Sequence, residues 1–104
     1  MSHFGEKIRA LREEKNLPLR KVGAAVDIDQ ATVSKWEKGT MRPKKEIVLK
    51  LAEFFEINKE ELLGSWVADK VVYEMGDDKN ALQTLQAAEK EIKYLAKKNN
   101  RNLI

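Results

Sequence analysis

The sequence has 104 residues, of which 42% are hydrophobic, and this length suits one domain with a modest core and an appended element. Its 20 Lys and Arg against 17 Asp and Glu give a net charge of +3, which is too mild to indicate a nucleic-acid partner by itself. The absence of cysteine excludes disulfides and thiolate metal sites, and the lack of a long apolar run argues against a membrane span or signal peptide, so we expect a soluble, cytoplasmic protein.

A first helix is predicted over residues 4–16, because Phe4, Ile8 and Leu11 recur at helical spacing and Asn16 can adopt the left-handed conformation that ends a helix. Residues 1–3 are expected to fray. His3 is the only histidine, and we interpret it as a solvated residue without a metal or catalytic role. No metal site is therefore predicted.

Two short helices joined by a tight turn are predicted next, over residues 19–26 and about 30–38. Asp29 is a suitable N-cap for the second helix, and Gly39 tolerates the left-handed conformation past its end. Apolar spacing turns one side of each helix toward a shared core, which we expect to contain Val22, Val26, Ile28, Val33 and Trp36. The opposite side of the second helix carries Gln30, Ala31, Ser34 and Lys35.

A basic loop and two further helices are predicted after Gly39. Pro43 should hold the chain extended before a helix over residues 48–57, whose core residues are expected to be Val48, Leu51, Ala52, Phe55 and Ile57. Asn58 and Glu61 resemble a capping box for a short fifth helix over residues 58–63. Trp66 is expected either to close the base of the core or to lie in a dimer interface.

The order and spacing of these five helices, from Phe4 to Trp66, resemble the phage-repressor-like transcriptional regulators of the XRE or Cro/C1-type family. The motif LRKVGAAVDIDQATVSKWEKG is similar to their helix-turn-helix. A lone motif of this kind is weakly specific, whereas five correctly ordered helices are a stronger signal. The resemblance implies an all-α, lambda-repressor-like five-helix domain over residues 1–66, braced by an ion pair between Arg12 and Glu37.

Three departures from the pattern of the family lie inside the motif, at Pro18 with Leu19, at Gly23 and at Asp27. Leu19 stands where many relatives have glutamine, and it cannot make the hydrogen bond to DNA that glutamine makes. Gly23 occupies a position usually held by alanine, where close helix packing demands a small side chain. Asp27 replaces the usual turn glycine, and aspartate tolerates positive φ better than most residues.

The resemblance places the 30–38 helix in the major groove of DNA, where residues of its N-terminal part reach base edges. Glutamine can bond adenine in a bidentate manner, and an alanine methyl suits a thymine methyl. Neighbouring lysines and arginines are expected to contact phosphates. The predicted DNA-binding residues are Gln30, Ala31, Thr32, Ser34, Lys35, Lys38, Arg42, Lys44 and Lys45, with Arg20 partly replacing the contact that Leu19 lacks.

Residues 67–104 are predicted to form a helical arm. One helix should continue to about Glu74 and break at residues 76–78. Asp78 should cap another helix, in which apolar residues recur every three or four positions before the chain frays over residues 97–104, although Leu103 and Ile104 are apolar for a free tail. This arm is too short to be stable alone, so it either folds back or pairs with a second chain. We favour a dimer, with candidate interface residues Trp66, Val71, Leu82, Leu85, Ile92 and Leu95.

The function predicted from these observations is sequence-specific binding of double-stranded DNA by a homodimer, regulating transcription from an operator whose half-sites lie roughly 10 bp apart or a multiple of it. The alternative is an antitoxin or adaptor whose C-terminal helices bind a partner protein, with DNA binding secondary. An enzyme is not supported, since the sequence lacks cysteine, a Gly-rich phosphate loop and an identifiable acid pair. No cofactor is expected.

Overall fold

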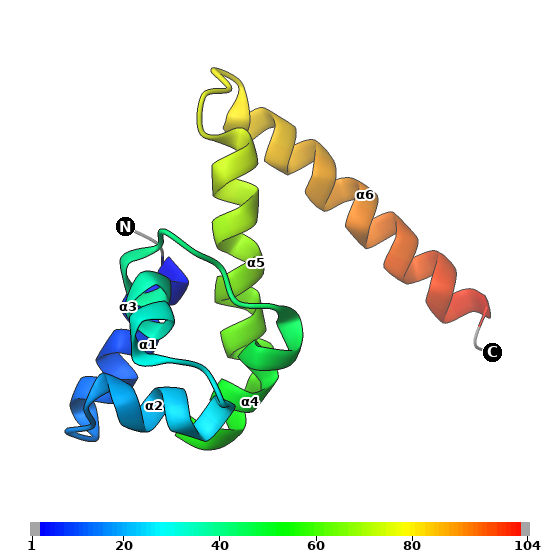
Figure 1. Cartoon of the computed structure of the whole chain (residues 1–104). Helices are drawn as coiled ribbons and strands as arrows, with labels where there is room; N and C mark the ends of the chain where they lie inside the picture. The colour runs from blue at the N-terminus through cyan, green and yellow to red at the C-terminus, as the bar shows by residue number, and fades with distance from the viewer. Residues whose placement is uncertain (1–2, 103–104) are drawn as a thin grey trace. The chain divides into compact units, whose positions relative to one another are not determined.

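The computed structural model describes residues 3–102, and their side chains up to residue 99. Within that range the chain forms helices and no strand: α1 (His3–Glu14), α2 (Leu19–Val26), α3 (Gln30–Lys38), α4 (Lys45–Phe55), α5 (Lys59–Met75) and α6 (Ala81–Asn102) (Figure 1). The all-α prediction is confirmed. The helices divide into two compact units, one reaching Val72 and the other starting at Tyr73. The apolar Leu103 and Ile104, and the fraying expected of residues 1 and 2, lie outside the described residues.

The helix ends of the first unit follow from individual capping residues. Asn16, Asp27 and Gly39 have φ angles of 54°, 60° and 79°, which is the left-handed conformation that lets the chain turn after α1, α2 and α3. All three turns were predicted. Glu56 also has a positive φ, of 57°, after α4. Glutamate has no marked preference for that conformation, so this turn could not be predicted locally.

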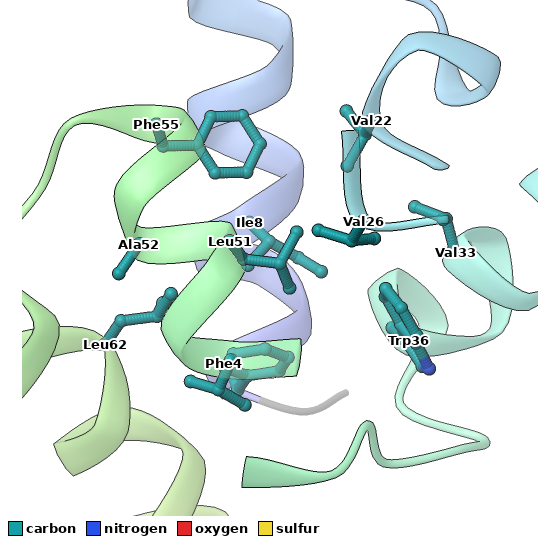
Figure 2. Packing of buried hydrophobic residues seen from close by; sticks show 11 residues of the cluster. Phe4, Ile8, Val22, Val26, Val33, Trp36, Leu51, Ala52, Phe55 and Leu62 are labelled. Atoms are coloured by element: carbon teal, nitrogen blue, oxygen red, sulfur yellow. The ribbon is translucent and has the colours of Figure 1, made fainter. Parts of the chain in front are cut away.

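One cluster of apolar side chains from α1 to α5 forms the core (Figure 2). Fully burying an aliphatic or aromatic side chain stabilises a protein by about 1.5–3 kcal/mol, so this cluster is the main source of stability. Its buried members, all but one of them labelled in the figure, are Phe4, Ile8, Val22, Val26, Val33, Trp36, Val48, Leu51, Ala52, Phe55 and Leu62. The predicted core residues Leu11, Ile28 and Ile57 are partly buried against it.

Two helices differ in detail from the prediction. The short fifth helix and the helix expected to continue to about Glu74 are one helix, α5, which passes through Gly64 and ends at Met75. Its start is as predicted, since Asn58 Oδ1 accepts a hydrogen bond from Glu61 N at 3.0 Å. The fourth helix begins at Lys45 rather than at residue 48.

The continuation of α5 also corrects the expectation that His3 frays. Asp69 Oδ1 accepts a hydrogen bond from His3 N at 2.9 Å, and Asp69 Oδ2 accepts one from Phe4 N at 3.0 Å. The carboxylate therefore caps the first turn of α1 from a position 66 residues along the chain. A cap this distant leaves no local signal, which is why His3 was assigned to a frayed end.

The second unit consists of the end of α5, the predicted break and α6. Asp78 Oδ1 accepts a hydrogen bond from Asn80 N at 2.8 Å just before α6 begins. The helix continues to Asn102, so fraying from residue 97 was wrong over the described residues. Lysines suit a helix and favour its C-terminal end, which explains the continuation.

Candidate nucleic-acid interface

α3 has one buried side and one exposed side. Val33 points into the domain, as do Trp36 and Glu37, which follow it about one turn later. Gln30, Ala31, Lys35 and Lys38 are exposed, and Thr32 and Ser34 are half-buried at the flanks. The six residues predicted to contact DNA from this helix are therefore on or beside its outward face.

An ion pair between half-buried Arg12 and buried Glu37 holds α3 against α1. Arg12 Nε donates to Glu37 Oε2 at 2.8 Å, and Arg12 Nη2 donates to Glu37 Oε1 at 3.1 Å. A third bond runs from Arg12 Nη1 to Leu17 O at 2.9 Å. Hydrogen bonding to Glu37 raises the pKa of Arg12 by more than burial lowers it, so the guanidinium stays charged. The pair implied by the family resemblance is confirmed.

The N-terminal end of α3 is capped by Asp29. Its Oδ2 accepts from Thr32 N at 3.1 Å, and its Oδ1 accepts from the Thr32 hydroxyl at 2.7 Å. The bond from the Thr32 hydroxyl lowers the pKa of Asp29 most, and the bond from Thr32 N lowers it further. The carboxylate therefore stays anionic. Because the hydroxyl proton of Thr32 is already donated to Asp29, this oxygen can meet a ligand in this rotamer only as an acceptor.

Two glycines allow α3 to approach its neighbours. A Cβ on Gly23 would lie 2.2 Å from the backbone oxygen of Ile28, and one on Gly5 would lie 2.5 Å from the backbone oxygens of Trp36 and Glu37. The small residue demanded at Gly23 was predicted, but the contact leaves no room even for alanine without a shift. The role of Gly5 was missed, since nothing nearby in the sequence indicates a helix crossing.

Leu19 lies beside the flank of α3 rather than out in solvent. With Arg12, Ser34 and Lys38 it lines a hollow of about 280 Å³, and it is partly buried against the core. An apolar side chain at this position is therefore stabilised by packing. Arg20, the next residue, is exposed at the start of α2.

The cations that follow α3 are exposed, and none of them pairs with an acidic side chain that the structure describes. Arg42, Lys44 and Lys45 are exposed, as are Lys35 and Lys38 on the helix itself. Among the described residues, the ion pairs are Lys7–Glu61, Arg9–Glu13, Arg12–Glu37 and Glu89–Lys93, and none involves these five cations. Lys44 occupies the N-cap of α4 without a side-chain hydrogen bond. The positive charge of Lys44 is unfavourable beside the positive end of the helix dipole. A bound anion would compensate this charge and would accept hydrogen bonds from the uncapped first turn.

Trp66 packs against its own domain and contacts the basic loop, which is the segment of residues 39–44 between α3 and α4. Its indole Nε1 donates to Pro43 O at 3.0 Å, and the guanidinium carbon of Arg42 lies 4.6 Å from the centre of its ring. Pro43 is buried and Trp66 is half-buried. This link between α5 and the loop was not predicted, because it joins residues far apart in the sequence.

The predicted dimer residues are divided between the two units. Trp66 and Val71 belong to the first unit, whereas Leu82, Leu85, Ile92 and Leu95 are exposed on α6. Within residues 3–102, three or more side chains suited to holding a metal ion do not come together, and no helix is long and apolar enough to cross a membrane.

A family model described as helix-turn-helix matches residues 8–62. The cryptic phage CTXphi transcriptional repressor RstR of Vibrio cholerae is 40% identical over 60 residues, covering 58% of this chain and 54% of RstR. The HTH-type transcriptional activator BcrR of Enterococcus faecalis is 33% identical over 60 residues, covering 58% of this chain and 29% of BcrR. This chain thus spans about half the length of one relative and less than a third of the other.

Two solved structures share the fold. The P22 c2 repressor, crystallised in complex with the synthetic operator 9T, matches with a TM-score of 0.55 and 26% identity, over 60% of this chain and 94% of that chain. The clp gene regulator ClgR from C. glutamicum matches with a TM-score of 0.55 and 18% identity, over 64% and 87% of the two chains. The lambda-repressor-like fold predicted from the sequence is confirmed.

Proposed function

This chain belongs to the helix-turn-helix family, and on that premise we propose that it is a DNA-binding transcriptional regulator that occupies an operator as a homodimer. The observation that carries the proposal is the exposed face of α3, where Gln30, Ala31 and Lys35 project away from a buried and ion-paired opposite side. A helix held in this way is stiff enough to enter the major groove, whose width admits one α-helix.

We assign base reading to the N-terminal half of α3. Gln30 can exchange two hydrogen bonds with an adenine, and the Ala31 methyl can pack on a thymine methyl. Ser34 and Lys35, one turn later, can reach a base edge or a phosphate. Thr32 has a smaller role, because its hydroxyl proton is donated to Asp29 and phosphate oxygens are themselves acceptors, so the hydroxyl must rotate away from Asp29 before it can bind the DNA backbone.

We assign phosphate binding to the basic loop and the start of α4. Arg42, Lys44 and Lys45 are exposed and unpaired among the described residues, and the first turn of α4 has no side-chain cap. Together with Lys38 and Arg20, these groups would fix the register of α3 on the duplex and make binding dependent on salt.

The homodimer is supported by the apolar side of α6. Leu82, Leu85, Ile92 and Leu95 are 77%, 40%, 66% and 47% exposed, and they recur on one side of the helix. A second copy of α6 would cover them and would bring two reading helices to a two-fold operator. Trp66 and Val71 remain candidates for an additional contact on α5.

The same exposed side of α6 favours a second candidate function, in which the arm binds a different protein. The chain would then act as an antitoxin or adaptor, with DNA binding secondary. The two candidates differ in what the purified protein does by itself, because a homodimer forms without any other protein.

Selection from a pool of random duplexes, followed by binding measurements between about 50 and 200 mM salt, tests the proposal. Enrichment of a two-fold site with half-sites roughly 10 bp apart, or a multiple of that, is expected. Affinity should fall with salt while the preference for the site persists. A pool that emerges without a shared sequence would contradict the assignment of base reading to α3.

Sedimentation of the protein in the absence of DNA separates the two candidate functions. A mass of two chains is expected for the homodimer. A monomer that forms a stable complex with the product of a neighbouring gene would favour the adaptor.

A further inference from the structure

We propose that Trp66 is a positioning residue for DNA binding, because its indole holds Arg42 and Pro43 of the basic loop in the conformation that meets the phosphate backbone. The inference rests on the proposed function and adds to it a residue of α5. Trp66 lies in a helix that has no part in base reading, and it is 23 residues from Pro43.

The indole engages two consecutive loop residues with two different parts of its ring system. Its single N–H donor is bonded to Pro43 O at 3.0 Å, and its π face lies 4.6 Å from the Arg42 guanidinium carbon. The hydrogen bond fixes the backbone of the loop, while the stack fixes the direction of the arginine side chain.

The loop needs an external support because it lies outside regular structure. At its start, Thr40 N donates to Lys35 O at 3.0 Å, and at its end Lys44 O accepts from Ile47 N and Val48 N. The bond from Trp66 reaches the segment between these two anchors. Pro43 has no N–H of its own, so its carbonyl is the backbone group through which the loop can be held at that residue.

The contact with Trp66 leaves Arg42 able to bind a phosphate. A cation–π contact engages the charge of the guanidinium, which lies 4.6 Å from the ring centre, and leaves N–H donors of the group for a phosphate. Arg42 is exposed and forms no ion pair with a residue that the structure describes. The side chain is thus ordered before DNA arrives, which reduces the entropy lost on binding.

Trp66 can serve as a fixed support because α5 is itself tied to α1. Lys7 pairs with Glu61 before Trp66, and Asp69 accepts hydrogen bonds from the first amides of α1 after it. The ring is also half-buried against the core. Because α5 is tied to α1 both before and after Trp66, the ring has a fixed position and can hold the loop in one conformation.

The test compares Trp66→Leu, Trp66→Phe, Arg42→Ala and the double variant Trp66→Leu with Arg42→Ala, measuring affinity for the selected operator across a salt series. Trp66→Leu removes both contacts, and Trp66→Phe retains a stacking face without the N–H donor. Trp66→Leu is expected to weaken binding roughly threefold to tenfold and to lower the slope of log K against log salt by about one, as Arg42→Ala does. The double variant should lose less affinity than the sum of the two single losses, because the contact between Trp66 and Arg42 is removed only once.

Phe54→Leu is the matched control, since Phe54 is another aromatic residue partly buried against the core but on α4. It should lower thermal stability and leave the salt slope unchanged. If Trp66→Leu fails to fold, Trp66→Phe tests the inference instead. Its loss of affinity should lie between zero and the loss expected for Trp66→Leu.

Two failures are distinguishable. A wild-type protein that shows no binding to any duplex removes the proposed function, and this inference falls with it. A wild-type protein that binds its operator, while the Trp66 variants keep its affinity within twofold and its salt slope, overturns this inference alone. Additive losses in the double variant would also overturn it.

Discussion

At the scale of single residues, the buried carboxylate of Glu37 depends on Arg12 to compensate its charge. It is 7% exposed, and both of its carboxylate oxygens accept hydrogen bonds from Arg12. A buried ion pair contributes little compared with a well-packed apolar pair, but removing one partner leaves a buried charge without compensation.

Arg12→Ala is therefore expected to lower the free energy of unfolding by about 3 kcal/mol. Urea denaturation measures this loss. The double variant Arg12→Met with Glu37→Met should recover much of it, because no charge remains buried. A single variant within 1 kcal/mol of wild type would show that the pair does not brace α3.

The cap on α3 should respond to acid. The pKa of Asp29 is lowered by bonds to Thr32, so the charged cap stabilises α3 fully above the ordinary aspartate value, about 3.9, and this stabilisation is lost as the pH falls through the lower folded value. The protection factor of the Thr32 amide against hydrogen exchange should fall in that acidic range. Asp29→Asn retains a capping oxygen without titrating, and it should remove the acid-dependent step. An identical pH profile in both proteins would contradict the assignment.

The sequence revealed residue-scale features whenever the cause was local. Asn16, Asp27 and Gly39 belong to the types that accept positive φ, and Asp29 is a favoured N-cap, so the turns around the motif could be predicted. Glu56 could not, because glutamate has no marked preference for positive φ.

At the scale of helices, two glycines in helical positions have opposite meanings. A Cβ on Gly23 would clash with Ile28 O at 2.2 Å, whereas one on Gly64 would meet nothing within 4 Å. Glycine is therefore needed for close approach in α2, and in α5 it only weakens the helix.

Gly64→Ala is expected to raise the free energy of unfolding by about 0.5–1 kcal/mol, and Gly23→Ala to lower it despite the same gain in helix propensity. Thermal or chemical denaturation of the two variants measures both signs. Stabilisation by Gly23→Ala would mean that the turn before α3 shifts without cost.

Several long-range contacts could not be predicted from the sequence, although the family resemblance implied the Arg12–Glu37 pair between α1 and α3. The hydrophobic spacing located the helices and most of the core, because it repeats every turn. It did not reveal that Asp69 caps α1, that Trp66 holds Pro43 or that Gly5 lies against α3. Each of these joins segments that only folding brings together, and the first two involve the part of α5 that follows Gly64.

At the scale of the whole molecule, the proposed homodimer depends on the apolar side of α6. Its periodicity could be predicted, but its partner could not, since an apolar stripe fits a second copy and a different protein equally well. The choice of a homodimer rests on the two-fold symmetry expected of operators.

Ile92→Glu should convert the dimer to a monomer and weaken operator binding, because a charge on the apolar side of α6 would be buried in the interface. Sedimentation equilibrium gives the mass. Ala87→Glu is the matched control, as it adds the same charge to an exposed position on the opposite side of α6. A dimer that survives Ile92→Glu would move the interface to α5.

The account depends most on base reading by α3, and the preference for operator over random duplex tests it directly. The variant Gln30→Ala with Lys35→Ala should lose roughly 1–3 kcal/mol of that preference for each base contact removed, with an unchanged circular dichroism spectrum. Gln86→Ala with Lys90→Ala, which removes the same residue types from exposed positions of α6, should keep the full preference. If the α3 variant discriminates as well as wild type, the reading surface lies elsewhere and the account is wrong.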